Sequence, residues 1–391
     1  MHIAIDGRTI VRNRTGVGVY AERLVRSLLQ IDSKNTYTLY LLEDTSSIEA
    51  PNLTKVMVNR FAGMGPNRFW ENFILPFSFS RHKIDVYFSP AYVLPVLRRA
   101  PRQHGGSHRT KCVVTIHDLV SYAFPETFTL KMRLWQRIFV GNAVRVADRI
   151  LADSQATKED ILRYYRIDPD RVDVVYLPVG EQFKRVDDCA VLSAMRQQLG
   201  LPEKFILYVG TLEPRKNVAR LAEAYAQLPE QLREEYALVL AGAPGWYSDE
   251  IIRSIDALKM PGRILRLGYV DQSKLPVLYS LASAFAYLSV YEGFGAPPIE
   301  AMACGTPVLC SSTSSLPEAV GNAGVLVDPS NVVQIRDGLQ RILTDNVLRT
   351  ELIAAGEKRV QEFNALDKAK EVLKIIEDVA TADVVTRRTP S

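Results

Sequence analysis

Short apolar runs alternate along the chain with longer stretches in which apolar residues recur on one helical face. His2–Asp6 is typical of a buried strand, and Val19–Gln30 places Tyr20, Leu24 and Leu28 on one side of a predicted helix. The same alternation continues through most of the sequence. It predicts an α/β protein built from parallel sheets that are covered by helices.

Two series of strand patterns predict two sheets. The first series lies at 2–6, 36–42, 55–61, 85–88, 112–116, 149–152 and 172–176, and the second lies at 204–209, 237–241, 264–268, 284–288, 307–310 and 324–327. Between them, Pro178–Glu203 loses the strand rhythm, which marks a domain boundary. We therefore expect two Rossmann-like doubly wound domains, at 1–180 and 181–365. Residues 366–391 are expected to form a C-terminal helix and, from Thr381, a disordered tail.

Composition narrows the class of protein. With 391 residues, of which 47% are apolar, the chain is long enough to give each domain its own core. No apolar stretch is long enough to span a bilayer, and the sequence opens on a strand pattern instead of a signal sequence, so a cytoplasmic location is expected. The four cysteines have no paired metal spacing and are expected to be buried free thiols, without disulfides.

The net charge of +4 is unevenly distributed. No acidic residue lies between Asp85 and Asp118, and that interval holds five cations: Arg98, Arg99, Arg102, Arg109 and Lys111. Together with the aromatic segment Phe69–Phe79, this interval would suit an anionic membrane surface, but a solvated loop beside a core helix explains it equally well. The basic residues form no stripe broad enough to indicate nucleic-acid binding.

The first motif with candidate chemistry is Gly210–Asn217 (GTLEPRKN). It follows the first strand of the second domain, where an open α/β sheet forms its ligand crevice. Arg215 and Lys216 suit a diphosphate, because a guanidinium binds phosphate oxygens as a fork and an ammonium adds a compact charge. On this run alone, two ordinary surface cations at a helix start are an equally good interpretation.

The second motif, Tyr291–Glu300 (YEGFGAPPIE), is more specific. Its two glycines let a backbone approach a ligand closely, and its prolines suit the first turn of a short helix. Glu292 on the loop and Glu300 on the helix can contact different parts of one extended ligand. Two solvated glutamates around a tight turn are the alternative, which the apolar helix beside Glu300 disfavours.

Together with Ala301–Pro307 (AMACGTP), these motifs resemble glycosyltransferase family 4, whose members have the two-domain GT-B fold. Further segments fit the same family: Thr15–Gly18, Thr115–Asp118, Ala147–Ser154 and Ser315–Gly321. The resemblance implies an acceptor-binding first domain and a nucleotide-sugar-binding second domain that face a central cleft. It also implies that the C-terminal helix crosses back to the first domain.

The resemblance gives each matching residue a role. Arg215 and Lys216 would hold the donor diphosphate and stabilise its charge as the sugar departs, and Glu300 would accept hydrogen bonds from the ribose hydroxyls. Glu292 would bind hydroxyls of the transferred sugar. His117 would reach the donor sugar near the reacting centre. The other expected donor-binding residues are Gly16, Gly210, Gly293, Phe294 and Gly295.

Some neighbouring residues have simpler interpretations. His117 would ordinarily be a satisfied histidine at a strand end, and its place at the carboxyl edge of the sheet favours a functional role. Asp118 either takes part in the same site as His117 or caps the following turn. Asp168–Asp170 is expected to be a turn, and neither a metal nor a cofactor is predicted. Family members retain the anomeric configuration, and because no side chain is an obvious covalent nucleophile, front-face departure and attack are expected.

The opening loop and the second motif are similar to bacterial family members that use GDP-mannose. That branch implies transfer of mannose to a saccharide acceptor, often carried on a polyprenyl diphosphate, in polysaccharide or lipopolysaccharide biosynthesis at the inner face of the plasma membrane. GDP-rhamnose or a UDP-sugar is an alternative donor. An oxidoreductase is disfavoured, because neither Gly16–Gly18 nor Gly210–Leu212 makes a dinucleotide fingerprint. The rival outside the enzymes is a non-catalytic nucleotide-sugar-binding protein.

Overall fold

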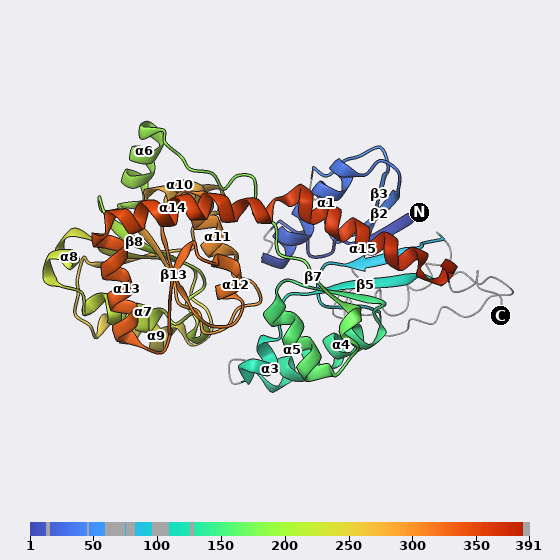
Figure 1. Cartoon of the computed structure of the whole chain (residues 1–391), viewed down its shortest axis with the longest axis horizontal. Coiled ribbons are helices and arrows are strands. Elements are labelled where there is room, and N and C mark those ends of the chain that lie inside the picture. The colour runs from blue at the N-terminus through green and yellow to red at the C-terminus, as the bar shows by residue number, and fades with distance from the viewer. Residues whose placement is uncertain are drawn as a thin grey trace. The chain divides into compact units, whose positions relative to one another are not determined.

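The computed structural model describes residues 1–12, 16–44, 47–58, 75, 83–95, 109–125 and 129–385. The chain divides into two compact units, each built around a parallel sheet (Figure 1). The first unit comprises Met1–Tyr122, Phe128–Pro178 and Ala365–Ser391, and the second comprises Ala123–Thr127 and Val179–Asn364. Phe124 belongs to the second unit, and its ring lies against that of Tyr291, with centroids 5.8 Å apart.

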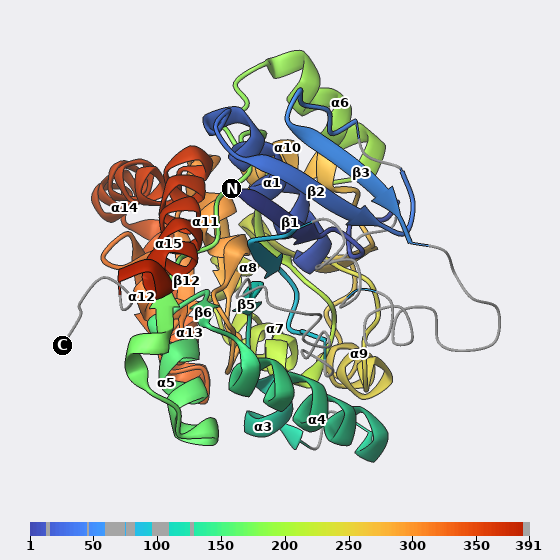
Figure 2. The same cartoon turned by 90° about the vertical axis from the view of Figure 1, so that its right-hand side faces the viewer.

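The first unit has a seven-stranded sheet in the order β3-β2-β1-β4-β5-β6-β7, and every neighbouring pair is parallel. Figure 2 shows β1, β2 and β3 side by side. The strands are β1 (His2–Asp6), β2 (Thr36–Leu41), β3 (Leu53–Met57), β4 (Val86–Ser89), β5 (Lys111–Ile116), β6 (Arg149–Ala152) and β7 (Val172–Val174). The helices are α1 (Gly16–Ile31), α3 (Val120–Ala123), α4 (Leu130–Val146), α5 (Gln155–Tyr165), η3 (Pro169–Arg171) and α15 (Ala365–Val385).

The C-terminal helix α15 is part of the first unit, where it packs against α1 (Figure 1). Val372 and Ile376 of α15 are buried in the same apolar cluster as Leu24 and Leu28 of α1. Their spacing of four residues places each pair on one face of its helix. The last part of the chain is therefore held by the core that its first helix helps to form.

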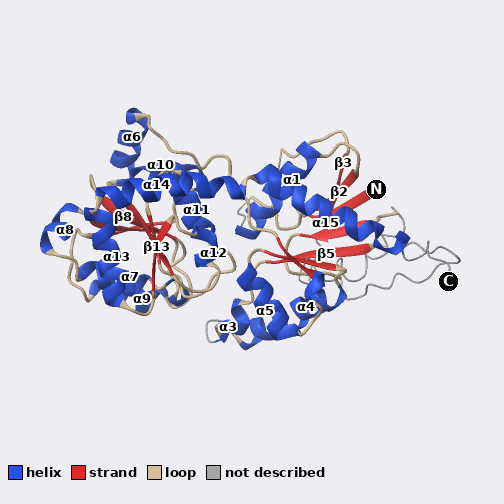
Figure 3. Cartoon of the chain, in the orientation of Figure 1, coloured by secondary structure: helices blue, strands red, loops and turns tan. Residues whose placement is uncertain are grey.

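The second unit has a six-stranded parallel sheet in the order β10-β9-β8-β11-β12-β13. Its central strands are apolar throughout and buried, as expected of parallel strands covered on both faces (Figure 3). The strands are β8 (Phe205–Val209), β9 (Ala237–Ala241), β10 (Ile264–Gly268), β11 (Ala284–Tyr287), β12 (Val308–Ser311) and β13 (Gly324–Val327).

Helices of the second unit pack in two groups, and the last helix of one group contacts the last helix of the other. One group is α7 (Val218–Ala226), α9 (Ser248–Asp256) and α13 (Val332–Thr344), and the other is α10 (Leu275–Leu281), α11 (Ala296–Ala303) and α14 (Asn346–Val360). The remaining helices are α6 (Cys189–Leu199), η4 (Pro214–Lys216), α8 (Glu230–Glu235), η5 (Gln272–Lys274), α12 (Leu316–Val320) and η6 (Gln361–Phe363). The strand order reverses between β8 and β11, which is where open α/β sheets bind ligands.

Two expectations from the sequence are wrong. Residues from Thr381 to Val385 continue α15 as helix instead of starting a disordered tail. Cys189 is exposed, because it begins α6, whose cap Asp188 accepts two backbone hydrogen bonds at the surface. The third strand ends at Met57, so the expected strand end at Phe61 lies outside the described residues.

Candidate functional site

The 3-10 helix η4 carries the predicted cations Arg215 and Lys216 directly after β8. Pro214 sets its first turn, and Asn217 ends it in the left-handed conformation before α7 begins. Asn217 is buried and donates from its side chain to the Pro329 carbonyl (2.7 Å). The turn is thus fixed at both ends, at the carboxyl edge of the sheet beside the point where strand order reverses.

Both cations bind the carboxylate of Glu292, which lies on the loop after β11. The Lys216 ammonium donates to Oε1 of Glu292 at 2.5 Å, and the Arg215 guanidinium donates to Oε2 at 2.9 Å. Tyr287 donates to the same Oε1 (2.9 Å) and accepts from Lys216 (2.8 Å). Arg215 also donates to Glu213 at 2.6 Å. We call these five residues the Glu292 cluster.

Burial and charge determine the protonation of this cluster. Burial alone would raise the pKa of Glu292, but Lys216 and Arg215 outweigh it and lower that pKa to about 2. Burial, together with the positive charge of Arg215, lowers the pKa of Lys216, against the opposing charge of Glu292. Glu292 is therefore ionised at neutral pH.

The interpretation of Arg215 and Lys216 as ordinary surface cations does not hold for Lys216. Lys216 is only 9% exposed, and its ammonium lies over the Tyr287 ring, with Nζ 5.2 Å from the ring centroid. Arg215 is partly buried, with 18% of its side chain exposed. A substitution at either position therefore leaves a buried carboxylate with one partner fewer.

The glycine-rich loop after Glu292 is held by two serines. Ser315 donates to the carbonyls of Glu292 and Phe294, both at 2.9 Å, and Ser314 donates to the Glu292 carbonyl at 2.7 Å. Gly295 has a φ of 96°, and an added Cβ would lie 2.4 Å from the Leu316 side chain. The backbone of this loop is thus fixed where the second motif requires a glycine.

Glu300 lies on α11, where Tyr279 of α10 donates a hydrogen bond to it. The Tyr279 hydroxyl donates to Oε2 of Glu300 at 3.3 Å. Pro297 and Pro298 fall in the first turn of α11, and Gly305 follows its end with a φ of 74°. The structure thus brings Arg215, Lys216 and Glu292 together, and places Glu300 on the adjoining helix.

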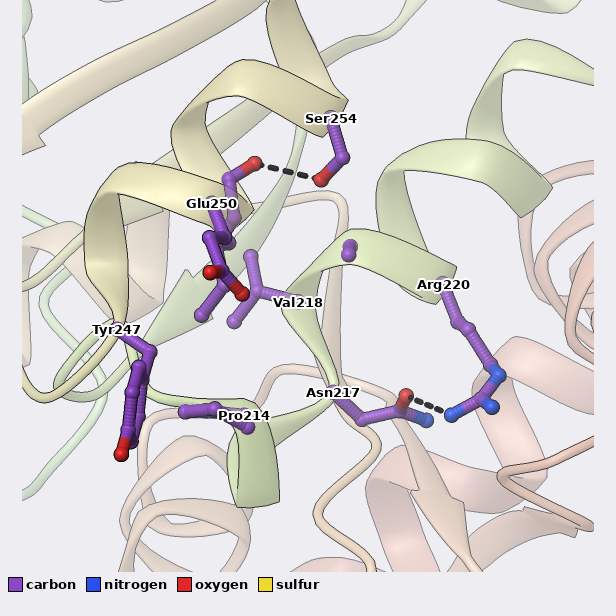
Figure 4. Close-up of a pocket in the computed structure, with 9 residues that line it drawn as sticks. Pro214, Asn217, Val218, Arg220, Tyr247, Glu250 and Ser254 are labelled. Carbon is purple, nitrogen blue, oxygen red and sulfur yellow. Dashed lines mark hydrogen bonds between the residues drawn. The ribbon is translucent and has the colours of Figure 1, made fainter. Parts of the chain in front are cut away.

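A cavity of about 390 Å³ opens beside η4, between α7 and α9 (Figure 4). Pro214 and Asn217 border it from the motif, and Tyr247 and Glu250 border it from the start of α9. None of the cluster residues lines it. The cavity therefore lies next to the turn that carries Arg215 and Lys216, and it is not the place where these two cations converge.

Gly242, which follows β9, is a residue that reasoning from the sequence missed. A Cβ at this position would lie 1.8 Å from the Gly210 carbonyl oxygen, so only glycine fits. Gly210 itself has a φ of 154°, within the range that favours glycine. The signal was present as a second glycine-containing loop, Ala241–Gly245, at the same edge of the predicted sheet.

In the first unit, His117 follows β5 and binds Asp153, which follows β6. Its Nδ1 lies 2.5 Å from Oδ2 of Asp153, and its Nε2 lies 2.8 Å from the Pro90 carbonyl oxygen. His117 is 7% exposed and Asp153 is 1% exposed. Asp118 caps α3, since its side chain accepts from the Val120 amide. The sequence missed Asp153, although a carboxylate directly after a buried strand is a usable signal.

Gly16 begins α1 and is exposed, with no atom within 4 Å of an added Cβ. Packing within the described residues therefore does not require a glycine there. Asp168 caps the 3-10 helix η3, which confirms that Asp168–Asp170 is a turn. Among the described residues, no His, Cys, Asp or Glu side chains form a group of three that could hold a metal ion.

The basic interval lies mostly outside the described residues, which exclude Arg98, Arg99 and Arg102. Arg109 is described, and it pairs with Asp148 at 3.4 Å. Arg109 thus has an acidic neighbour in space although none is near it in the sequence, because Asp148 directly precedes β6, the strand next to β5. In the part of the chain that is described, no helix is long and apolar enough to cross a membrane.

Comparison with known proteins gives matches to both units. The family model described as Glycosyltransferase Family 4 matches residues 14–182, and the model described as Glycosyl transferases group 1 matches residues 193–359. The O-antigen chain mannosyltransferase B of Escherichia coli is 32% identical, over 72% of this chain and 71% of that protein. The serotype-specific mannosyltransferase WbdA of the same species is 35% identical over 65% of this chain. The match spans only 32% of the length of WbdA.

Two further proteins extend the comparison. A Campylobacter jejuni protein, named as an N-acetylgalactosaminyltransferase acting on a diphospho-undecaprenol substrate, is 28% identical over 91% of this chain and 95% of its own. The structure of sucrose-phosphate synthase from Thermosynechococcus elongatus covers 98% of this chain and 100% of its own with a TM-score of 0.75, at 21% identity. The fold is thus shared over the whole length, and sequence, family models and fold agree: this chain belongs to glycosyltransferase family 4 and has its GT-B fold.

Proposed function

We propose that this glycosyltransferase moves a mannosyl residue from GDP-mannose to a saccharide acceptor, with retention of the anomeric configuration. The observation that carries the proposal is the Glu292 cluster, in which Arg215 and Lys216 converge at the point where strand order reverses. Such cations suit a diphosphate leaving group, whose negative charge grows as the sugar departs. The choice of mannose is supported by the Escherichia coli relatives, whose names describe mannosyltransferases.

The residues of the Glu292 cluster would exchange hydrogen-bond partners when the nucleotide-sugar donor binds. Diphosphate oxygens take the fork of Arg215 and the ammonium of Lys216, which frees the Glu292 carboxylate to accept hydrogen bonds from the transferred sugar. Glu300 accepts from the ribose, and Gly210, Gly293, Phe294 and Gly295 form the backbone around the donor. Gly16 and His117 of the first unit are assigned to the same donor.

The proposed transfer step needs neither a cofactor nor a metal ion. The bond between the sugar C1 and the diphosphate oxygen breaks, and a bond from C1 to the acceptor oxygen forms on the same face. The acceptor hydroxyl proton goes to the departing diphosphate. The cations neutralise the leaving group in the way that a divalent ion does in other enzymes.

We further propose a lipid-linked acceptor in O-antigen or lipopolysaccharide biosynthesis. The names of the Escherichia coli and Campylobacter relatives support it. The basic interval that ends with Arg109 and Lys111 would dock the protein on the anionic inner face of the membrane. Replacing its five arginines and lysines by serine should release the protein from anionic vesicles at low salt, whereas wild-type protein that ignores such vesicles would refute the docking.

A donor panel tests the proposed reaction. The purified chain is given GDP-mannose, GDP-rhamnose or UDP-glucose, each with an undecaprenyl-diphosphate-linked or a soluble oligosaccharide and with a chelator present. We expect transfer from GDP-mannose alone, an α-linked product by NMR, and preference for the lipid-linked acceptor. Transfer from another donor would refute the mannose assignment, a β-linked product would refute retention, and dependence on added manganese would refute the metal-free step. If the chain binds the donor but neither transfers the sugar nor hydrolyses the donor, it is a non-catalytic binding protein.

A further inference from the structure

The environment of His117 restricts where its protons lie. Both of its ring nitrogens are within hydrogen-bond distance of an oxygen: Asp153 Oδ2 at Nδ1 and the Pro90 carbonyl at Nε2. A carbonyl oxygen can only accept, so Nε2 must carry a hydrogen. An ionised carboxylate oxygen can also only accept, and at 2.5 Å a bare Nδ1 lone pair facing it would be repelled. The pair therefore holds a second proton between Nδ1 and Oδ2.

We propose that Asp153 is a positioning residue that keeps His117 a hydrogen-bond donor, so that His117 meets the saccharide donor with an N–H group and never as a base. In either position of the shared proton, Nε2 keeps its hydrogen. A sugar or phosphate oxygen that replaces the Pro90 carbonyl at Nε2 is then met by a donor. His117 cannot take the acceptor proton, which agrees with the diphosphate taking it.

The topology explains why these groups meet. Pro90, His117 and Asp153 each follow the end of one of three adjacent parallel strands, β4, β5 and β6. The carboxyl ends of parallel strands share one edge of the sheet, so the imidazole bridges its two neighbouring strand ends. The bridge ties together loops that would otherwise be independent.

The surroundings hold the imidazole ring in this orientation. Tyr20 and Tyr92 meet it edge to face, with ring centroids 5.0 and 5.1 Å away. The His117 carbonyl accepts from Thr157 at 3.3 Å, which fixes its backbone. Oδ1 of Asp153 is buried without a hydrogen-bond partner among the described residues, so the carboxylate relies on His117 for compensation.

Electrostatics agree with this geometry. Burial alone would lower the pKa of His117, but the charge of Asp153, its hydrogen bond and that of Pro90 outweigh burial and raise the pKa, with a smaller contribution from Asp118. Burial also raises the pKa of Asp153. Both directions mean that the pair retains its shared proton at a higher pH than an exposed histidine would.

Nitrogen-15 NMR of histidine-labelled protein tests the inference, with His117→Gln used to assign the signal. We expect Nε2 of His117 to carry its hydrogen at pH 7 in the wild type, with the second proton held between Nδ1 and Asp153. Asp153→Asn should lower the pKa of His117 by at least about one unit, a tenfold loss of the protonated form above that pKa. The matched control Asp173→Asn, which breaks an ion pair with Arg149 on the same sheet, should leave the His117 titration unchanged.

Activity gives the second readout. Asp153→Asn should reduce kcat/KM about tenfold at pH 8 and regain activity as the pH is lowered. A bare Nε2 on wild-type His117 at pH 7, an unchanged titration in the Asp153→Asn variant, or a loss of activity that does not depend on pH would overturn the inference. If the variant does not fold, the wild-type titration decides. The activity arm rests on the proposed function, whereas the NMR arm uses no donor and fails or succeeds separately.

Discussion

Replacing Lys216 by methionine removes one charge from the Glu292 cluster with little change in volume. Glu292 then keeps Arg215 on Oε2 and Tyr287 on Oε1, but loses the 2.5 Å bond from the ammonium. Breaking a buried ion pair costs about 3–5 kcal/mol. Because two partners stay in place, we expect the lower end, about 3 kcal/mol. For a unit of this size that corresponds to a fall in Tm of roughly 6–12 °C.

Calorimetry of the purified variant measures this loss. The matched control is Lys204→Met, which also breaks a 2.5 Å ion pair, with Glu235, but on an exposed part of the same unit. We expect little change in Tm there, because exposed ion pairs are screened by water. The Lys216→Met variant should also lower turnover about a hundredfold. Equal Tm values for wild type and Lys216→Met would refute the buried pair, and normal turnover would refute its contact with the diphosphate.

Three other variants test the same region and its counterpart in the first unit. Gly242→Ala should lower stability by about 3 kcal/mol in a denaturant titration, since its Cβ would meet the Gly210 carbonyl at 1.8 Å, and an unchanged midpoint would contradict this close approach. Gly16→Ala, where nothing lies within 4 Å, should instead keep the midpoint and weaken donor use; a lower midpoint would show packing that the structure lacks. Glu292→Gln should flatten the acid limb of the stability profile: a lowered pKa stabilises above pH 4.5 and is lost as the pH falls towards 2, so equal acid limbs would contradict the assignment.

Much of the fold was predictable because the signals are local. The parallel strands are short, mostly apolar runs, and those at His2–Asp6, Arg149–Ala152, Ala237–Ala241, Ile264–Gly268 and Gly324–Val327 were placed to the residue. Helix ends were less certain. Thr381–Val385 was assigned to the tail, yet it continues α15, whose preceding turns are anchored against α1.

Local patterns in the chain were enough to predict the two parallel sheets, the edge at which the motifs lie and the residue types available for chemistry. They could not predict which groups pair, because that depends on the three-dimensional arrangement. Lys216 and Glu292 are 76 positions apart and His117 and Asp153 are 36 apart, so their contacts depend on strand order. A sequence motif shows which residue types follow the end of a strand. Their hydrogen-bond and ion-pair partners come from the ends of neighbouring strands in the sheet. That is why cations expected in water are paired and partly or fully buried, and why a histidine expected to reach for a ligand has both nitrogens engaged.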